Sequence, residues 1–213
     1  MIDFKNILVI GAHFDDAELG CGGIMKKFSN DKNVYKLTLT NNMTLFEQYN
    51  IKVNFESSLE NSKEACKILG VKELTDLGFV ECNHLKYNTE LMQKIEKKIF
   101  DLNIDTVFIH YFDDINQDHV QSSILSRVAA RHINNIFFYQ SNGYILQTKF
   151  YPTIFFDISN EYEYKKKALY CYSNEHNRFD RLFDITLKKA EIYGYANKCK
   201  YAEGFVPMKI LYQ

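Results

Sequence analysis

Side chains of the types that bind metal ions gather at two places in this sequence. The first is the segment 13–16 (His-Phe-Asp-Asp), directly after the apolar run 7–10, and the second is the segment 113–119, which ends in an Asp-His pair. Imidazole and carboxylate groups are common ligands of catalytic zinc, which holds three protein ligands and keeps one position for water. Together the two segments therefore indicate a hydrolytic metal site.

His13 and Asp16 are three residues apart, so both can point into one site from a tight turn, and His119 adds a second imidazole. A metal in such a site lowers the pKa of its water from 15.7 to about 7 and polarises a carbonyl group. Asp15 adjoins these residues and can accept the proton of that water. Spacing alone leaves a structural interpretation open, because paired aspartates also cap helices and a histidine after a strand is often a hydrogen-bonded core residue.

The elements that must position these residues alternate along the chain. Short apolar runs predict strands, and helical spacing of apolar residues predicts helices between them. The predicted strands are 7–10, 34–39, 74–77, 106–109, 136–139 and 153–158, and the predicted helices are 18–28, 55–69, 91–102, 120–128, 162–172 and 179–193. This order predicts a single Rossmann-like α/β domain over residues 1–213, with a mostly parallel sheet and helices on both faces.

In an open α/β sheet, ligands bind outside the carboxyl ends of the strands. The polar segments 13–16 and 113–119 both follow predicted strands, so we expect them to converge at one sheet edge although they are about 100 residues apart. His110, at the end of the predicted strand 106–109, belongs to the same edge.

Composition excludes several classes of protein. The 213 residues carry a net charge of -1 and no basic stripe, which argues against a nucleic-acid binder. The five cysteines are scattered without a Cys-x-x-Cys pair, so we expect reduced thiols and a cytoplasmic location. The N-terminal segment lacks a signal-peptide pattern, and no apolar run approaches the ~20 residues of a membrane span.

The polar segments also resemble the signatures of a known family. Residues 12–23 (Ala-His-Phe-Asp-Asp-Ala-Glu-Leu-Gly-Cys-Gly-Gly) resemble the first motif of the PIG-L / LmbE-like family, and residues 114–119 resemble its second, D-x-H-P-D-H. Weaker similarity is found in the segments 64–71, 77–79, 156–158 and 202–205. The resemblance implies a zinc-dependent (Zn2+) N-deacetylase that acts on a small N-acylated amino sugar or sugar conjugate. Family members are often oligomeric, so a homo-oligomer is a further expectation.

The resemblance also implies roles for individual residues. His13, Asp16 and His119 match the zinc ligands, and Asp15 matches the general base. Asp118 matches a carboxylate that orients the catalytic histidine two residues before it in the family.

Two departures from the family motifs bear on catalysis. Phe14 replaces the usual proline, which changes the pocket wall but keeps the ligand spacing. Asn116 replaces the usual histidine, which stabilises the oxyanion or protonates the leaving amine. An asparagine can donate a hydrogen bond to an oxyanion, but it cannot act as an acid at neutral pH. Asp15, after serving as base, can return the proton to the amine, and His110 is a second candidate for the role of residue 116.

Other interpretations remain open at this point. A receiver-type signalling domain also places paired acids after its first strand, but it leaves His13 and the glycines of residues 20–23 unexplained. Those glycines do not form the G-x-G-x-x-G pattern of a dinucleotide-binding protein. A catalytically weakened metal- and sugar-binding member of the same fold is favoured only by Asn116.

Substrate choice is expected to depend on the loops 41–54, 81–88 and 139–150. Their aromatic residues either stack on a sugar ring or serve as core or subunit contacts, and they are Phe46, Tyr49, Tyr87 and Tyr144. The remaining histidines, which have no visible partner in the sequence, are expected to be structural: His84, His132 and His176.

Overall fold

Strands and helices alternate along most of the chain. The computed structural model describes residues 4–47, 51–144, 148–173 and 183–211. In chain order the elements are β1 (Asn6–Gly11), α1 (Asp16–Ser29), β2 (Asn33–Thr38), β3 (Thr44–Phe46), β4 (Ile51–Val53), α2 (Phe55–Leu69), β5 (Lys72–Leu74), α3 (Thr89–Asp101), β6 (Thr106–His110), α4 (Gln117–Ala129), β7 (Asn135–Tyr139), β8 (Ile154–Asp157), α5 (Tyr162–Tyr170), α6 (Asp184–Ala196) and β9 (Ala202–Lys209). The predicted α/β class is confirmed.

One mixed sheet of seven strands organises the described residues, in the order β5-β2-β1-β6-β7-β9-β8. The first five of these strands are parallel, and β9 runs antiparallel to both β7 and β8. The chain first places β2 and β5 on one side of β1 and then places β6 and β7 on the other side. The point where the strand order reverses therefore lies between β1 and β6, which is where open α/β sheets bind their ligands.

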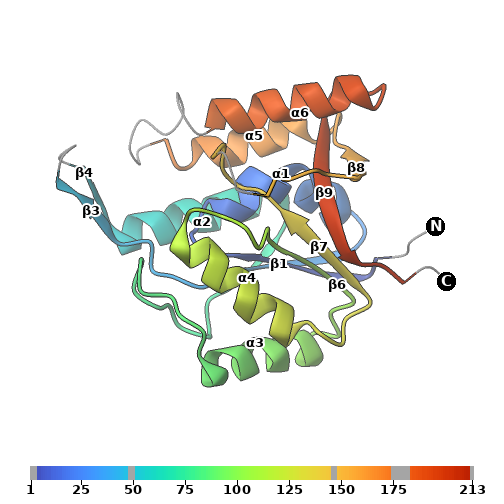
Figure 1. Ribbon diagram of the computed structural model, residues 1–213. Coiled ribbons are helices and arrows are strands. Elements are labelled where there is room, and N and C mark those ends of the chain that lie inside the picture. Colours follow the sequence, from blue (N-terminus) through green and yellow to red (C-terminus); the bar gives the residue numbers. More distant parts are fainter. Residues whose placement is uncertain (1–3, 48–50, 145–147, 174–182, 212–213) are drawn as a thin grey trace.

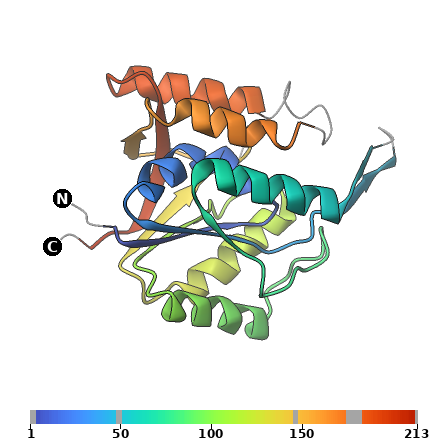
Figure 2. The ribbon, with the colours of Figure 1, turned by 180° about the vertical axis from the view of Figure 1, so that it is seen from behind.

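Helices cover both faces of the sheet, as Figures 1 and 2 show. α1 and α2 lie on one face with α5 packed against them, and α3 and α4 pair on the other face. Residues of β1 alternate between the two cores: Ile7 and Val9 belong to the first, and Leu8 and Ile10 to the second. A strand buried on both faces needs such a continuous apolar run.

The helix ends follow from local side-chain chemistry. Asn54 caps α2 by accepting hydrogen bonds from the backbone of residues 56 and 57, and Gly70 ends it with a left-handed φ of 74°. Asn116 caps α4 in the same way as Asn54 caps α2. α1 and α4 begin at Asp16 and Gln117, two and three residues before the predicted starts, because the polar residues of both motifs form the first helical turns.

Four strands differ from those predicted. The strand predicted at 74–77 lies at 72–74, and the hairpin of β3 and β4 was not predicted. β9 was also not predicted, because Gly204 and Pro207 interrupt its pattern. β8 pairs with residues 202–205 and β7 with residues 206–209, so Pro207 has a partner strand on one side only and its missing N–H is tolerated.

The helix predicted at 179–193 is described from Asp184 onward, and the earlier part of that prediction lies outside the described residues. Among the helices that the structure describes, none has the length and apolar character needed to cross a membrane.

Candidate active site at the carboxyl ends of β1 and β6

The two polar segments meet at the switch point of the sheet. His13 lies in the turn between β1 and α1, Asp16 is the first residue of α1, and His119 lies in the first turn of α4. The sequence prediction that residues about 100 positions apart converge at one sheet edge is thus met by the fold.

Three ligand-type side chains face one another in this site. His13 Nδ1 lies 3.3 Å from Asp16 Oδ2 and 3.2 Å from His119 Nε2, and His119 Nε2 lies 3.2 Å from Asp16 Oδ1. The backbone N–H of His13 donates to Asp16 Oδ2 at 2.7 Å, which fixes the turn. Two nitrogens and one carboxylate at these separations form a group that can hold a metal ion.

Each imidazole of this group has a carboxylate on its other ring nitrogen. Asp118 Oδ2 lies 3.3 Å from His13 Nε2, and Asp114 Oδ2 lies 3.0 Å from His119 Nδ1. Zinc-binding histidines almost always carry such a partner, which fixes the tautomer and the ring orientation. The donor set and its surroundings therefore fit a zinc ion.

The two carboxylates are themselves held in place. Asp118 accepts hydrogen bonds from the backbone N–H groups of Asn83 at 2.7 Å and Leu85 at 3.2 Å. Asp114 accepts from Asn142 Nδ2 at 2.9 Å. These contacts tie the site to the loop before α3 and to the segment after β7.

The close packing of charged groups shifts the pKa values of the three ligand-type residues. Burial disfavours the imidazolium form of His13, but hydrogen bonds to Asp118 and Asp16 outweigh burial and raise its pKa well above the usual value. For His119, the charge of Asp16 and the hydrogen bond to Asp114 likewise outweigh burial and raise the pKa to about 9. Burial alone would raise the pKa of Asp16, yet the charges of His119 and His110 hold it well below its usual range.

His110 lies behind the ligand group and is 1% exposed. Its ring stacks on that of His119 with centroids 4.1 Å apart, and its Nε2 lies 3.1 Å from Asp16 Oδ2. The same nitrogen lies 3.1 Å from the backbone nitrogen of Ala12 and 3.2 Å from the hydroxyl of Tyr139. Because His110 is buried behind the ligand group, we expect it to position Asp16 and not to contact a substrate.

Asn116 has a divided role in the site. Its Oδ1 accepts hydrogen bonds from the backbone N–H groups of Asp118 at 2.9 Å and His119 at 3.4 Å. The cap thus uses the amide oxygen and leaves Nδ2 as the donor of this half-buried side chain. Asp15, 3% exposed, is the N-cap residue of α1 and its side chain makes no cap hydrogen bond.

A buried ion network lies beneath the turn that carries His13. Lys36 Nζ donates to the backbone oxygen of Phe14 at 2.6 Å and to Glu18 Oε1 at 2.7 Å. The hydroxyl of Tyr172 donates to the same oxygen of Phe14 at 2.8 Å. Glu73 is a second carboxylate near this ammonium, at 3.9 Å. The turn therefore rests on two donors fixed in the core.

Three residues of the site have no functional signal in the sequence. Asp114 was part of the second motif, but nothing in its spacing pairs it with His119. Asn142 and Cys82 lie in loops without a motif, and Cys82 joins His13 and Asp118 in a second group of ligand-type atoms. No signal in a single sequence identifies such loop contacts.

Other predictions of the sequence stay open. Tyr87 and Tyr144 are exposed, and their contact with a sugar remains a prediction. His84 and His132 are exposed, and Tyr49 and His176 lie outside the described residues.

Comparison with known proteins identifies the family of the chain. Residues 8–130 match the PIG-L family, described as GlcNAc-PI de-N-acetylase. The chain is 32% identical to "Uncharacterized deacetylase YaiS" of Escherichia coli (strain K12) over 169 residues, which cover 74% of this chain and 84% of that protein.

Two solved structures share the fold at low identity. N,N'-diacetylchitobiose deacetylase from Pyrococcus horikoshii is 20% identical with a TM-score of 0.79, over 97% of this chain and 84% of that one. GalB, the 4-carboxy-2-hydroxymuconate hydratase from Pseudomonas putida KT2440, is 16% identical with a TM-score of 0.82, over 98% of each chain. The fold thus carries more than one reaction, and the family assignment rests on the sequence match: this chain belongs to the PIG-L family of deacetylases.

Proposed function

We propose that this chain is a zinc-dependent hydrolase that removes the acetyl group from a small N-acetylated amino sugar or sugar conjugate. The observation that carries the proposal is the group of His13, Asp16 and His119, in which each imidazole has its own carboxylate partner. Membership of a deacetylase family and the likeness to an N,N'-diacetylchitobiose deacetylase support the substrate class.

His13, Asp16 and His119 would hold the ion, which supplies Lewis-acid activation of the water and of the acyl carbonyl. Asp118 and Asp114 keep the two imidazoles in the tautomers that present Nδ1 and Nε2 to the ion. The protein thereby prepares the site before the substrate arrives.

Asp15 acts as the base that takes the proton of the attacking water. A carboxylate beside the reacting water suits this task. After the tetrahedral intermediate forms, the same carboxyl group returns the proton to the departing nitrogen, so that the products are acetate and a free amine. Asn116 cannot supply that proton, because an amide is not an acid at neutral pH.

Asn116 stabilises the oxyanion through its amide nitrogen. The cap hydrogen bonds fix the amide oxygen towards the backbone of α4, so Nδ2 is the end that faces away from the helix. A donor held in place before the reaction stabilises the developing charge without a reorganisation cost.

The proposal is tested by acetate release from N-acetylglucosamine, N,N'-diacetylchitobiose and N-acetylglucosaminyl conjugates, with bound zinc measured on the same samples. We expect Asp15→Asn to lower turnover at least 100-fold while it keeps its zinc. Asp31→Asn, at an exposed aspartate paired with Lys32, is the control and should match the wild type. A fully active Asp15→Asn variant, or no acetate from any substrate of the panel, would contradict the proposal.

A further inference from the structure

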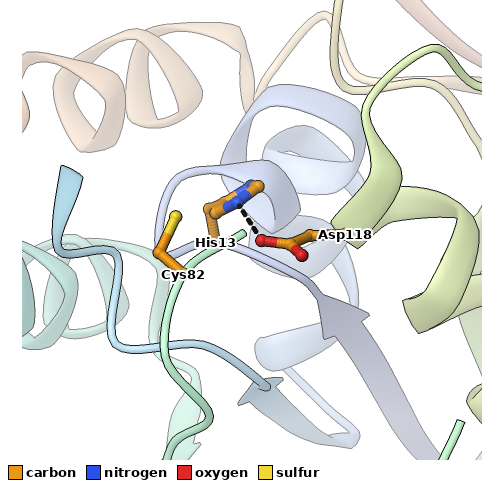
Figure 3. Close-up of side chains that lie close together, drawn as sticks. All are labelled: His13, Cys82 and Asp118. Carbon is orange, nitrogen blue, oxygen red and sulfur yellow. Dashed lines mark hydrogen bonds and ion pairs between the residues drawn. The ribbon is translucent and has the colours of Figure 1, made fainter. Parts of the chain in front are cut away.

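A second group of metal-binding side chains shares His13 with the first. His13, Cys82 and Asp118 bring one ligand atom each within 4.8 Å of one another (Figure 3). They come from the β1–α1 turn, the loop before α3 and the first turn of α4. A nitrogen, a sulfur and an oxygen ligand suit zinc and other thiophilic divalent ions.

The two groups can use different ring nitrogens of His13. Nδ1 faces Asp16 and His119, at 3.3 and 3.2 Å, whereas Nε2 lies 3.3 Å from Asp118 Oδ2. The ring nitrogens of an imidazole point in different directions. One ring can therefore present a ligand atom to each of two positions at the same time.

The thiol is held in place by its loop. The backbone N–H of Cys82 donates to Asn41 Oδ1 at 3.0 Å, and Sγ lies 3.2 Å from Thr44 Oγ1. The next residue, Asn83, donates its backbone N–H to Asp118, so the loop fixes the thiol and the carboxylate relative to each other. Cys82 is 5% exposed, which makes this a built arrangement and not a chance contact at the surface.

We propose that His13 Nε2, Cys82 Sγ and Asp118 form a second position for a thiophilic divalent ion, which inhibits the enzyme when zinc is in excess. The proposal rests on the proposed function for the identity of the first position. Binding of the second ion forms bonds to sulfur, nitrogen and oxygen, and the protons of Sγ and Nε2 pass to solvent. Asp118 then serves the ion and no longer orients His13, which disturbs the first position.

Cobalt titration of the metal-free protein tests this proposal, because a thiolate–cobalt bond gives a charge-transfer band in the near ultraviolet. The group of His13, Asp16 and His119 contains no sulfur and gives no such band. We expect the wild type to bind two equivalents, with the band growing only during the second. Cys82→Ser should bind one equivalent without the band, and Cys199→Ser, outside both groups, should behave as the wild type.

Zinc titration of acetate release gives a second readout. Wild-type activity should rise over the first equivalent and fall with excess zinc, and Cys82→Ser should need at least tenfold more zinc for the same inhibition. Thermal melting confirms that this variant is folded. If it is not, Cys82→Ala replaces it and should likewise abolish the band.

A wild type without the band at fivefold cobalt, or a band that persists in Cys82→Ser, would overturn the proposal. A band that saturates with the first equivalent would support the thiolate position. That result would instead contradict the proposed function, because the first ion would then not lie between His13, Asp16 and His119.

Discussion

Asp118 Oδ2 lies 3.3 Å from Nε2 of His13, on the side of the ring that faces away from Asp16 and His119. The family resemblance predicts that this carboxylate orients residue 116. The contacts between Asp118 and Asn116 instead run from the backbone N–H of Asp118 to the Asn116 side chain, and the Asp118 carboxylate pairs with His13. With asparagine at position 116, the carboxylate supports the metal-binding imidazole.

Removal of this carboxylate should weaken metal binding. We expect Asp118→Asn to lower zinc affinity 10- to 100-fold, the range seen when the hydrogen-bond partner of a ligand histidine is lost. Competition with a chromophoric chelator measures the affinity. Asp113→Asn is the matched control, because Asp113 lies four residues before the α4 start and bonds to Thr148 instead of an imidazole. Equal zinc affinity in the Asp118 variant and the control would contradict this role.

Two variants at position 116 separate capping from catalysis. Serine can cap a helix but has no amide nitrogen, so Asn116→Ser should keep the melting temperature. We expect its kcat to fall about 100-fold, because loss of one oxyanion donor costs about 2.7–4 kcal/mol. Asn116→Ala should lose the cap as well, about 1 kcal/mol or a few degrees in Tm.

Kinetics and thermal melting of both position-116 variants check these expectations. If Asn116→Ser keeps kcat within about twofold of the wild type, the side chain is a helix cap only, and the oxyanion role passes to another group.

The buried network under the metal site should make stability depend on pH. Burial raises the pKa of Glu18 from 4.5 to about 7, despite the nearby Lys36 ammonium. Between these values the folded chain binds a proton that the unfolded chain has lost, so the free energy of unfolding falls as pH rises. The slope from this group is at most about 1.4 kcal/mol per pH unit.

Urea unfolding of the wild type and Glu18→Gln from pH 4.5 to 8 measures this dependence. Glutamine cannot ionise, so the stability of the wild type relative to Glu18→Gln should decline as pH rises towards 7 and then level off. Glu64→Gln, at an exposed glutamate paired with Lys67, should show no such trend relative to the wild type. A pH-independent difference for Glu18→Gln would show that the carboxyl group is already ionised throughout.

Much of the fold follows from local patterns in the sequence. β1 and β6 are continuous apolar runs buried on both faces, and α2 has an asparagine cap and a glycine stop. The sequence does not predict β9, because a glycine and a proline interrupt its strand pattern. The strand forms because β8 pairs with its first half and β7 with its second half. That sharing is a property of the assembled sheet.

The candidate site also has a part that the sequence predicts and a part that it does not. The motif residues converge because parallel strands end at one edge, which topology alone predicts. The partners of those residues do not follow from topology. Asn142 reaches Asp114 across 28 residues, and the loop of Asn83 reaches Asp118 across 35 residues. Such contacts depend on loop paths, which a single sequence does not encode as a pattern.

In the proposed function, His13, Asp16 and His119 hold the ion on which deacetylation depends. The most direct test loads metal-free protein with zinc from zero to one equivalent and measures acetate released from the best substrate of the panel. We expect no activity without metal, a linear rise to one equivalent, and loss of activity in His119→Ala, which keeps only the position between His13, Cys82 and Asp118 for zinc. Acetate release at the full rate by metal-free protein, or by a His119→Ala variant, would show that these three residues do not hold the ion.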